Sequence, residues 1–178
     1  IVTRIDEARA WAAGGPLVLK PEYSRFGVHV RLYPRGMPAD AAPLGLAQDW
    51  VAQRYYQGTE LCSYSVADRG RLLAHSVYRP SYRLRRSSSF YFEPSPNAAI
   101  HEFVERFVAK IGFTGQISFD WTDGYDGLPT VLECNPRATS GVHLFADDDA
   151  LPAALMGETM ECLEPSRCQP KMLAGVMV

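Results

Sequence analysis

Hydrophobic and polar residues alternate along much of this chain, which is typical of β-strands that bury one face. The alternation, with many β-branched and aromatic residues, predicts strands at residues 28–33, 50–56, 60–67, 71–78, 90–92, 117–121 and 130–134. Residues 16–19 form a short apolar run that leads into Lys20 and Pro21, and we interpret it as another strand. Glycine and aspartate turns between several of these segments predict antiparallel hairpins and a meander.

Three other stretches have the pattern of helices. Residues 3–13 are rich in helix-forming residues, with Thr3 as the expected N-cap and two glycines after the last turn. Asn97 is expected to cap a second helix over residues 98–111, which ends at Gly112, and three consecutive acids (147–149) are expected to start a third over residues 150–162. The second helix has an apolar stripe that predicts a core-facing side, namely Ile100, Phe103, Val104, Phe107, Val108 and Ile111. Strands mixed with helices in this way predict the α+β class.

Composition narrows the class of protein. The 178 residues are 47% hydrophobic and 21% charged, which suits one globular unit or two lobes with a sizeable core. The net charge of -2 argues against binding to nucleic acid or to an anionic membrane, and no apolar run is long enough to span a bilayer. The four cysteines show no Cys-x-x-Cys pair, so we expect free thiols and a cytoplasmic location.

Residues 117–141 carry the most informative pattern, a hairpin followed by an acid, an amide and an arginine. Side chains alternate along a strand and opposed residues share a face, so an unbulged hairpin places Asp120, Glu133 and Asn135 on one side. The other side, expected to be core, carries Ile117, Phe119, Trp121, Leu132 and Cys134. Carboxylate and amide oxygens are the ligands that magnesium prefers, and Arg137 is a fixed cation suited to phosphate. The alternative is a surface hairpin with solvated acids.

The order Glu133-Cys134-Asn135-Pro136-Arg137, with Asp120 on the preceding strand, resembles the metal-binding end of the ATP-grasp superfamily. This superfamily includes the large chain of carbamoyl-phosphate synthase, biotin carboxylase and carboxylate–amine ligases. The resemblance implies that Asp120, Glu133 and Asn135 hold Mg²⁺, with Mn²⁺ as an alternative, and that Arg137 balances negative charge during catalysis.

The first predicted hairpin resembles the phosphate-binding element of the same superfamily. Lys20 lies at a strand end and would contact the nucleotide phosphates, and Arg25 and Gly27 lie in the following loop. A cation and backbone N–H groups suit phosphate oxygens. The loop departs from the glycine-rich pattern of many relatives, because Gly27 is its only glycine. The alternative for Lys20 is an ordinary surface lysine.

Gln53-Arg54-Tyr55-Tyr56, with Glu60 after the next turn, resembles the adenine- and ribose-binding hinge of the superfamily. The resemblance implies that the Arg54 carbonyl and the Tyr56 N–H bind the adenine edge and that Glu60 binds the ribose. Gln53 stands where the family usually has an acid. A plain hairpin with a solvated Glu60 is the alternative.

A basic cluster and two histidines lie outside these motifs. The basic cluster Arg79–Arg86 is either a solvated face or a contact for an anionic substrate, and we expect His101 to be exposed and His143 to be packed or solvated.

The three elements follow the ATP-grasp order over residues 16–141. The resemblance implies a smaller lobe at about residues 1–56, with the phosphate loop, and a larger lobe at about 57–178, with the metal site. It implies an ATP- and Mg²⁺-dependent ligase, or its ATP-binding part, that activates a small carboxylate as an acyl phosphate for attack by an amine or similar nucleophile. We expect a fragment without the N-terminal domain of most members, and a homodimer is left open. A nucleotide-binding module without chemistry, a phosphotransferase on this fold and a plain α+β binding domain are the alternatives.

Overall fold

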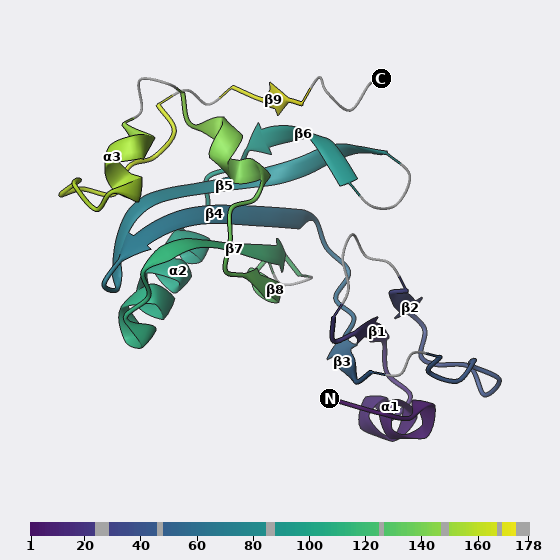
Figure 1. The fold of residues 1–178 in the computed structure, drawn as a ribbon. Coiled ribbons are helices and arrows are strands. Elements are labelled where there is room, and N and C mark those ends of the chain that lie inside the picture. Colours follow the sequence, from purple (N-terminus) through teal and green to yellow (C-terminus); the bar gives the residue numbers. More distant parts are fainter. Residues whose placement is uncertain are drawn as a thin grey trace. The chain divides into compact units, whose positions relative to one another are not determined.

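The computed structural model describes residues 1–23, 29–45, 48–84, 88–124, 127–146, 150–166 and 169–173. The chain forms two compact units, which divide between Gln57 and Gly58 (Figure 1). Both units combine antiparallel sheets with helices, so the α+β class predicted from the sequence is confirmed. None of the helices in the described part of the chain has the length and apolar character needed to cross a membrane.

The first unit is built on a three-stranded sheet in the order β2-β1-β3. Its elements are α1 (Ile5–Ala12), β1 (Leu17–Pro21), β2 (Arg31–Tyr33) and β3 (Trp50–Arg54), and both strand pairs are antiparallel. Strand β1 alternates between buried and half-buried positions. The buried positions face a small core of Val2, Ala8, Leu17, Leu19 and Trp50.

The N-cap of helix α1 lies one residue later than the sequence predicted. Arg4 rather than Thr3 occupies the N-cap position. The Glu7 carboxylate accepts hydrogen bonds from the backbone N–H groups of Thr3, at 2.8 Å, and of Arg4, at 3.2 Å. Glu7 therefore satisfies the N–H group of the N-cap residue and that of the residue before it.

The second unit is built on a six-stranded sheet in the order β8-β7-β4-β5-β6-β9. The strands are β4 (Glu60–Asp68), β5 (Arg71–Leu84), β6 (Ser88–Pro94), β7 (Gly115–Thr122), β8 (Thr130–Asn135) and β9 (Lys171–Met172). The turn between β4 and β5 has positive φ angles at Arg69 and Gly70, in agreement with the Asp-Arg-Gly turn predicted there.

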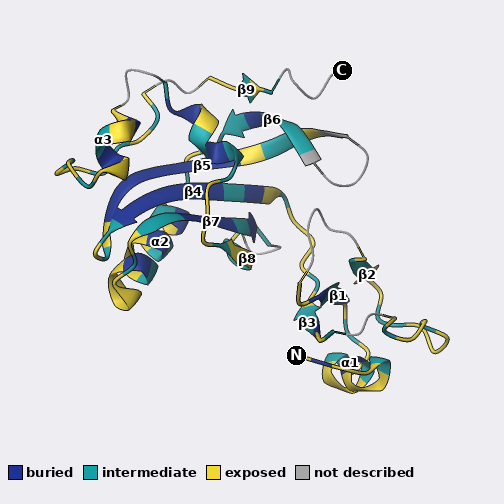
Figure 2. Cartoon of the chain, viewed as in Figure 1, coloured by how far each residue is buried: buried dark blue, intermediate teal, exposed yellow. Residues whose placement is uncertain are grey.

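The two faces of this sheet are covered by different elements (Figure 1). Helix α2 (Ala98–Ile111) lies on one face, and the short helices η1 (Ser140–Leu144) and α3 (Leu151–Leu155) lie on the other. Figure 2 shows β4 and β5 as the buried centre of the unit. The α2 side of the core consists of Leu61, Ala67, Leu72, Val77, Ile100, Val104, Val108, Ile117, Phe119 and Trp121.

Helix α2 has the predicted bounds and caps. The Asn97 side chain accepts a hydrogen bond from the Ile100 N–H at 3.1 Å, and Gly112 ends the helix in the left-handed conformation. Ile111 was expected in the core but is 55% exposed, because it lies in the last turn beyond the buried stripe. His101 was expected to be exposed, but its side chain is only 35% exposed and its ring stacks on His75.

The remaining expectations concern the third helix, the cysteines and His143. The helix predicted over residues 150–162 is wrong in length, since α3 ends at Leu155 and Gly157 adopts a positive φ that breaks the helix. The acids at 147–149 lie outside the described residues. Cys62, Cys134 and Cys162 are free thiols, as expected, and His143 is exposed.

Candidate functional site

The carboxylates of the predicted metal site lie on two paired strands of the second unit. Asp120 on β7 is directly opposite Glu133 on β8, and Ser118 is opposite Asn135. Opposed residues share a face of a sheet, so Asp120 and Glu133 project to the same side. Phe119 and Trp121, the neighbours of Asp120, are buried on the other side against α2. The register therefore agrees with the geometry expected from the sequence.

Strand β8 differs from the unbulged strand that the sequence analysis assumed. The register shifts next to Asp120, because Trp121 pairs with Val131 and leaves Leu132 as the extra residue of a β-bulge. Leu132 and Cys134 were expected in the core, but Leu132 is half-buried and Cys134 is exposed. Strand β8 is at the edge of the sheet while α2 packs on β5, so alternation along β8 does not produce a buried face.

Hydrogen bonds join the candidate site residues to one another. Asn135 Nδ2 donates to Asp120 Oδ2 at 3.4 Å, and Arg137 Nη2 donates to Asn135 Oδ1 at 3.3 Å. From the other side, the Cys62 thiol on β4 donates to Asp120 Oδ1, with 3.2 Å between Sγ and Oδ1. The structure thus brings together Asp120, Asn135 and Arg137, and it adds a cysteine that the sequence analysis had not assigned to the site.

A row of side chains continues from the site into the sheet. Cys62 is paired with Asp120 on one side and with Tyr78 of β5 on the other. Burial raises the pKa of the Cys62 thiol, and the nearby Asp120 charge raises it further. Burial also raises the pKa of Tyr78 well above its ordinary value. Both groups are therefore neutral at physiological pH and are available as hydrogen-bond donors.

A second chain of polar groups holds the backbone around Arg137. Thr139 Oγ1 is 3.3 Å from the Tyr78 hydroxyl and donates to Ser118 Oγ at 3.0 Å. Ser118 Oγ in turn donates to the Arg137 carbonyl at 3.1 Å. The sequence analysis did not identify Tyr78, Ser118 or Thr139 as part of the site. Polar residues inside apolar strands were the available signal, and that signal is weak.

Glu60, the predicted ribose ligand, lies on the same face as Asp120. It is two residues before Cys62 on β4, is exposed and pairs with Thr122 of β7. The turn before Glu60 is hydrogen-bonded to the residue that follows β7, because the Thr59 N–H donates to Asp123 Oδ1 at 2.6 Å. A Cβ at Gly58 would lie 2.5 Å from Thr122 Oγ1, so this close approach requires glycine. The structure therefore groups Glu60 with the predicted metal ligands.

The first unit carries the remaining predicted residues. Lys20 is opposite Val51, and it lies on the face of the small sheet away from buried Leu17 and Leu19. Gln53, opposite Val18, is on that same face. Arg25 and Gly27 lie outside the described residues.

The backbone of the predicted hinge has a defined orientation. The Tyr55 N–H donates to the Pro16 carbonyl at 3.2 Å, so the backbone groups of Tyr55 point toward β1. Hydrogen-bonding directions alternate along an antiparallel strand, and the N–H and C=O of Arg54 therefore point away from β1, at the edge of the sheet. Arg54 and Tyr56 have exposed side chains, and Tyr55 is half-buried. This orientation is compatible with a ligand bound along the Arg54 edge.

The oxygen atoms of the candidate site suit a hard divalent cation. The set comprises two carboxylates and one amide oxygen, and a cation of this kind completes its shell with phosphate oxygens and water. In the described part of the chain, no cluster of three or more His, Cys, Asp and Glu residues could hold a metal. A set of two carboxylates and one amide leaves coordination positions for phosphate oxygens and water.

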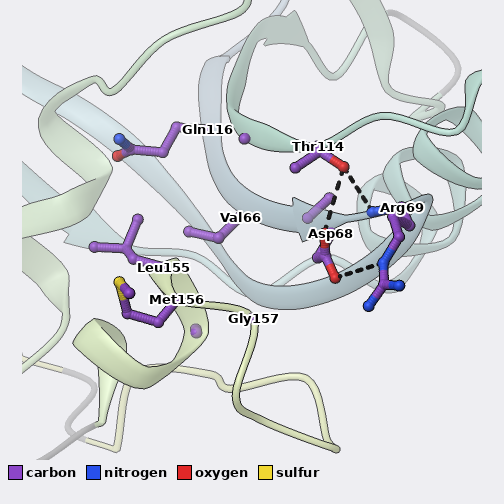
Figure 3. Close-up of a pocket in the computed structure, with 11 residues that line it drawn as sticks. Val66, Asp68, Arg69, Thr114, Gln116, Leu155, Met156 and Gly157 are labelled. Carbon is purple, nitrogen blue, oxygen red and sulfur yellow. Dashed lines mark hydrogen bonds and ion pairs between the residues drawn. The ribbon is translucent and has the colours of Figure 1, made fainter.

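A hollow of about 370 Å³ lies at the other end of β4 and β7 (Figure 3). Its lining comes from the β4–β5 turn, the start of β7 and the residues around the end of α3. An ion pair of 3.1 Å joins Asp68 and Arg69 there, and Thr114 donates to Asp68. None of the predicted site residues lines this hollow. The exposed Arg79 of the basic cluster is also not part of it, and the side chains of Arg83, Arg85 and Arg86 lie outside the described residues.

Comparison with solved structures identifies the fold. The biotin carboxylase domain of 2-oxoglutarate carboxylase from Hydrogenobacter thermophilus, solved as a dimer with MgADP, ADP and bicarbonate, is 16% identical, with a TM-score of 0.65 over 89% of this chain and 40% of that chain. Phosphoribosylamine–glycine ligase from Thermotoga maritima is 18% identical, with a TM-score of 0.63 over 90% of this chain and 50% of that one. The ATP-grasp ligase PsnB, complexed with a minimal precursor, Mg and ADP, is 19% identical, with a TM-score of 0.54 over 86% of this chain and 50% of that chain.

The similarity is one of fold. No family model matches the chain, and a search of curated proteins finds no match either. The chain spans about half the length of the solved structures that it matches, or less. The sequence motifs predicted this fold, and the comparison confirms that the chain has the fold of the ATP-grasp proteins.

Proposed function

We propose that this chain is an ATP- and Mg²⁺-dependent ligase, or the ATP-binding part of one, that activates a carboxylate for attack by an amine. The observation that carries the proposal is the pairing of Asp120 with Glu133 on one face of the sheet, with Asn135 and Arg137 hydrogen-bonded beside them. Solved structures of the same fold contain MgADP, which supports ATP and magnesium as the ligands.

The chain's own residues have distinct tasks in this proposal. Asp120, Glu133 and Asn135 would hold magnesium, which when bound neutralises phosphate charge. Lys20 and Arg137 contribute fixed positive charge for the phosphates, and Arg25 and the Gly27 backbone are proposed to assist them. The Arg54 carbonyl and the Tyr56 N–H would bind the adenine edge, within the hinge segment of residues 53–56. Glu60 would bind the ribose hydroxyls.

The proposed reaction has two steps. A carboxylate oxygen of the substrate attacks the γ-phosphorus of ATP, the bond to the bridging oxygen breaks, and ADP leaves with an acyl phosphate formed. An amine then attacks the acyl carbon, loses a proton and displaces phosphate. The chemistry requires positioning and charge neutralisation rather than a side-chain nucleophile, which agrees with a site made of acids, an amide and cations.

Trapping the intermediate tests this function. The chain is incubated with ATP, Mg²⁺ and a panel of small carboxylates in the presence of hydroxylamine, and both ADP and acyl hydroxamate are measured. ATP binding is measured separately by calorimetry. We expect a hydroxamate with at least one carboxylate and none after chelation of Mg²⁺. ADP with a stable phosphorylated product would indicate a phosphotransferase, and Mg²⁺-dependent ATP binding without turnover would indicate a nucleotide-binding module. Absence of ATP binding would refute all three.

A further inference from the structure

The Asp120 carboxylate is held at both of its oxygen atoms. Asn135 Nδ2 donates to Oδ2 at 3.4 Å, and the Cys62 thiol donates to Oδ1 with a donor–acceptor distance of 3.2 Å. Two donors on different oxygens fix the plane of a carboxylate, whereas one donor leaves it free to rotate. Each oxygen of a carboxylate has more than one lone pair, so the hydrogen bonds leave room for a cation.

Packing fixes the position of the Cys62 sulfur. Cys62 is opposite both Asp120 and Tyr78 in the middle of the sheet, and it packs against a cluster that includes Tyr78, Phe92 and Leu144. A thiol suits this position because it packs as a small apolar group and still provides one weak donor.

Two other cysteines, Cys134 and Cys162, lie in the described part of the chain, and neither has such a contact. Cys162 is half-buried and packs against the core on the α2 side of the sheet, the opposite side from Asp120. Its sulfur lies 3.9 Å from the Leu163 carbonyl, the next residue in the chain. Cys134 is exposed at the edge strand. Cys62 therefore differs from both in its direct contact with a candidate metal ligand.

We propose that Cys62 is a positioning residue that orients Asp120 for the divalent cation, an inference that rests on the proposed function. In other metal sites, a residue that hydrogen-bonds to a metal ligand fixes the rotamer of that ligand and adjusts the affinity of the site for the ion. We assign this task to Cys62. Cys62 acts through Asp120 and contacts neither the ion nor the nucleotide.

Mn²⁺ binding in the presence of saturating ADP provides the first test, with free Mn²⁺ measured by electron paramagnetic resonance. Cys62→Ala should bind Mn²⁺ about tenfold more weakly, since loss of such a partner commonly lowers metal affinity by about that factor. Cys62→Ser, which keeps a donor, should bind nearly as well as wild type. Cys162→Ala is the control, because it removes a half-buried sulfur on the α2 side of the sheet. This variant should bind Mn²⁺ as wild type does, while the thermal stability of the protein falls.

The infrared S–H stretch of the Cys62 thiol gives a second readout, which reports on its hydrogen bond directly. The difference spectrum between wild type and Cys62→Ser isolates the Cys62 band, and that between wild type and Cys134→Ser isolates an exposed thiol. The Cys62 band should lie at lower frequency, because a donated S–H bond is weakened, and it should shift upward when Mn²⁺ and ADP are added.

The inference would be overturned, while the proposed function stands, by wild-type Mn²⁺ affinity in Cys62→Ala. A Cys62 band that coincides with that of Cys134 and does not respond to Mn²⁺ would overturn it as well. Equal loss in the serine and alanine variants would also overturn it. Failure of the wild-type chain to bind Mn²⁺ with ADP would instead remove the proposed function, and this inference with it.

Discussion

Buried His75 should make the stability of the protein sensitive to acid. The residue is 3% exposed, and its ring lies between β5 and α2, stacked on His101 with 4.8 Å between ring centroids. Ser65 Oγ is 2.9 Å from Nδ1, whereas Nε2 is buried without a hydrogen-bond partner among the described residues. Burial, with a smaller contribution from His101, lowers the pKa of His75 from 6.5 to about 3. A proton on this ring is therefore disfavoured in the folded state.

The size of the effect follows from linkage. Below pH 6.5 the unfolded chain binds a proton at His75 that the folded chain does not, so stability falls as the pH falls, down to about pH 3. Each pH unit in this window costs about 1.4 kcal/mol for one such group. Between pH 7 and pH 5, His75 alone should therefore remove about 2 kcal/mol from the free energy of unfolding.

Urea unfolding at pH 7, 6 and 5 measures this slope. The test variant is Ser65→Ala/His75→Leu, which removes the titrating ring together with the hydroxyl that would lose its partner. Its pH slope should be shallower than that of wild type by about 2 kcal/mol over the range. His143→Gln, which removes an exposed histidine, serves as the control and should keep the wild-type slope. Equal slopes in wild type and the double variant would refute the reasoning.

Two other substitutions test the packing. Gly141→Ala should lower the free energy of unfolding by about 2 kcal/mol in urea titrations, because a Cβ there would collide with the Tyr64 and Tyr78 side chains. Gly45→Ala, with nothing within 4 Å of its Cβ, should have little effect; a similar loss in both would contradict this account. Asn97→Ala should cost about 1 kcal/mol in thermal unfolding, since it removes the cap of α2, and a loss indistinguishable from zero would show that the cap is unimportant.

Local features were predictable from the sequence. The bounds of α2 followed from its capping asparagine, its apolar spacing and its terminal glycine, and all three signals lie within a few residues of one another. The facing of Asp120 and Glu133 agrees with the prediction, but the bulge at Leu132 produces it. The pairs nearer the turn, Trp121 with Val131 and Thr122 with Thr130, would otherwise place Asp120 opposite Leu132.

Features that depend on distant segments were not predictable. The contact between Cys62 and Asp120 joins residues 58 positions apart, and only the strand order of the sheet brings them together. The exposure of Cys134 depends on the edge position of β8, which alternation along the strand does not reveal. The end of α3 depends on Gly157 and on the small number of core contacts that this helix makes, with only Leu151 and Ala154 buried.

Titration of the chain with Mg²⁺-ATP by calorimetry tests the central claim most directly. Glu133→Gln keeps the size of the side chain and removes its charge, so we predict an affinity lower by about tenfold, or about 1.4 kcal/mol. Glu102→Gln, at an exposed position on α2, should bind as wild type does. Binding by wild type and Glu133→Gln with the same affinity, or no binding by wild type, would contradict the assignment of Asp120, Glu133 and Asn135 as a magnesium–nucleotide site.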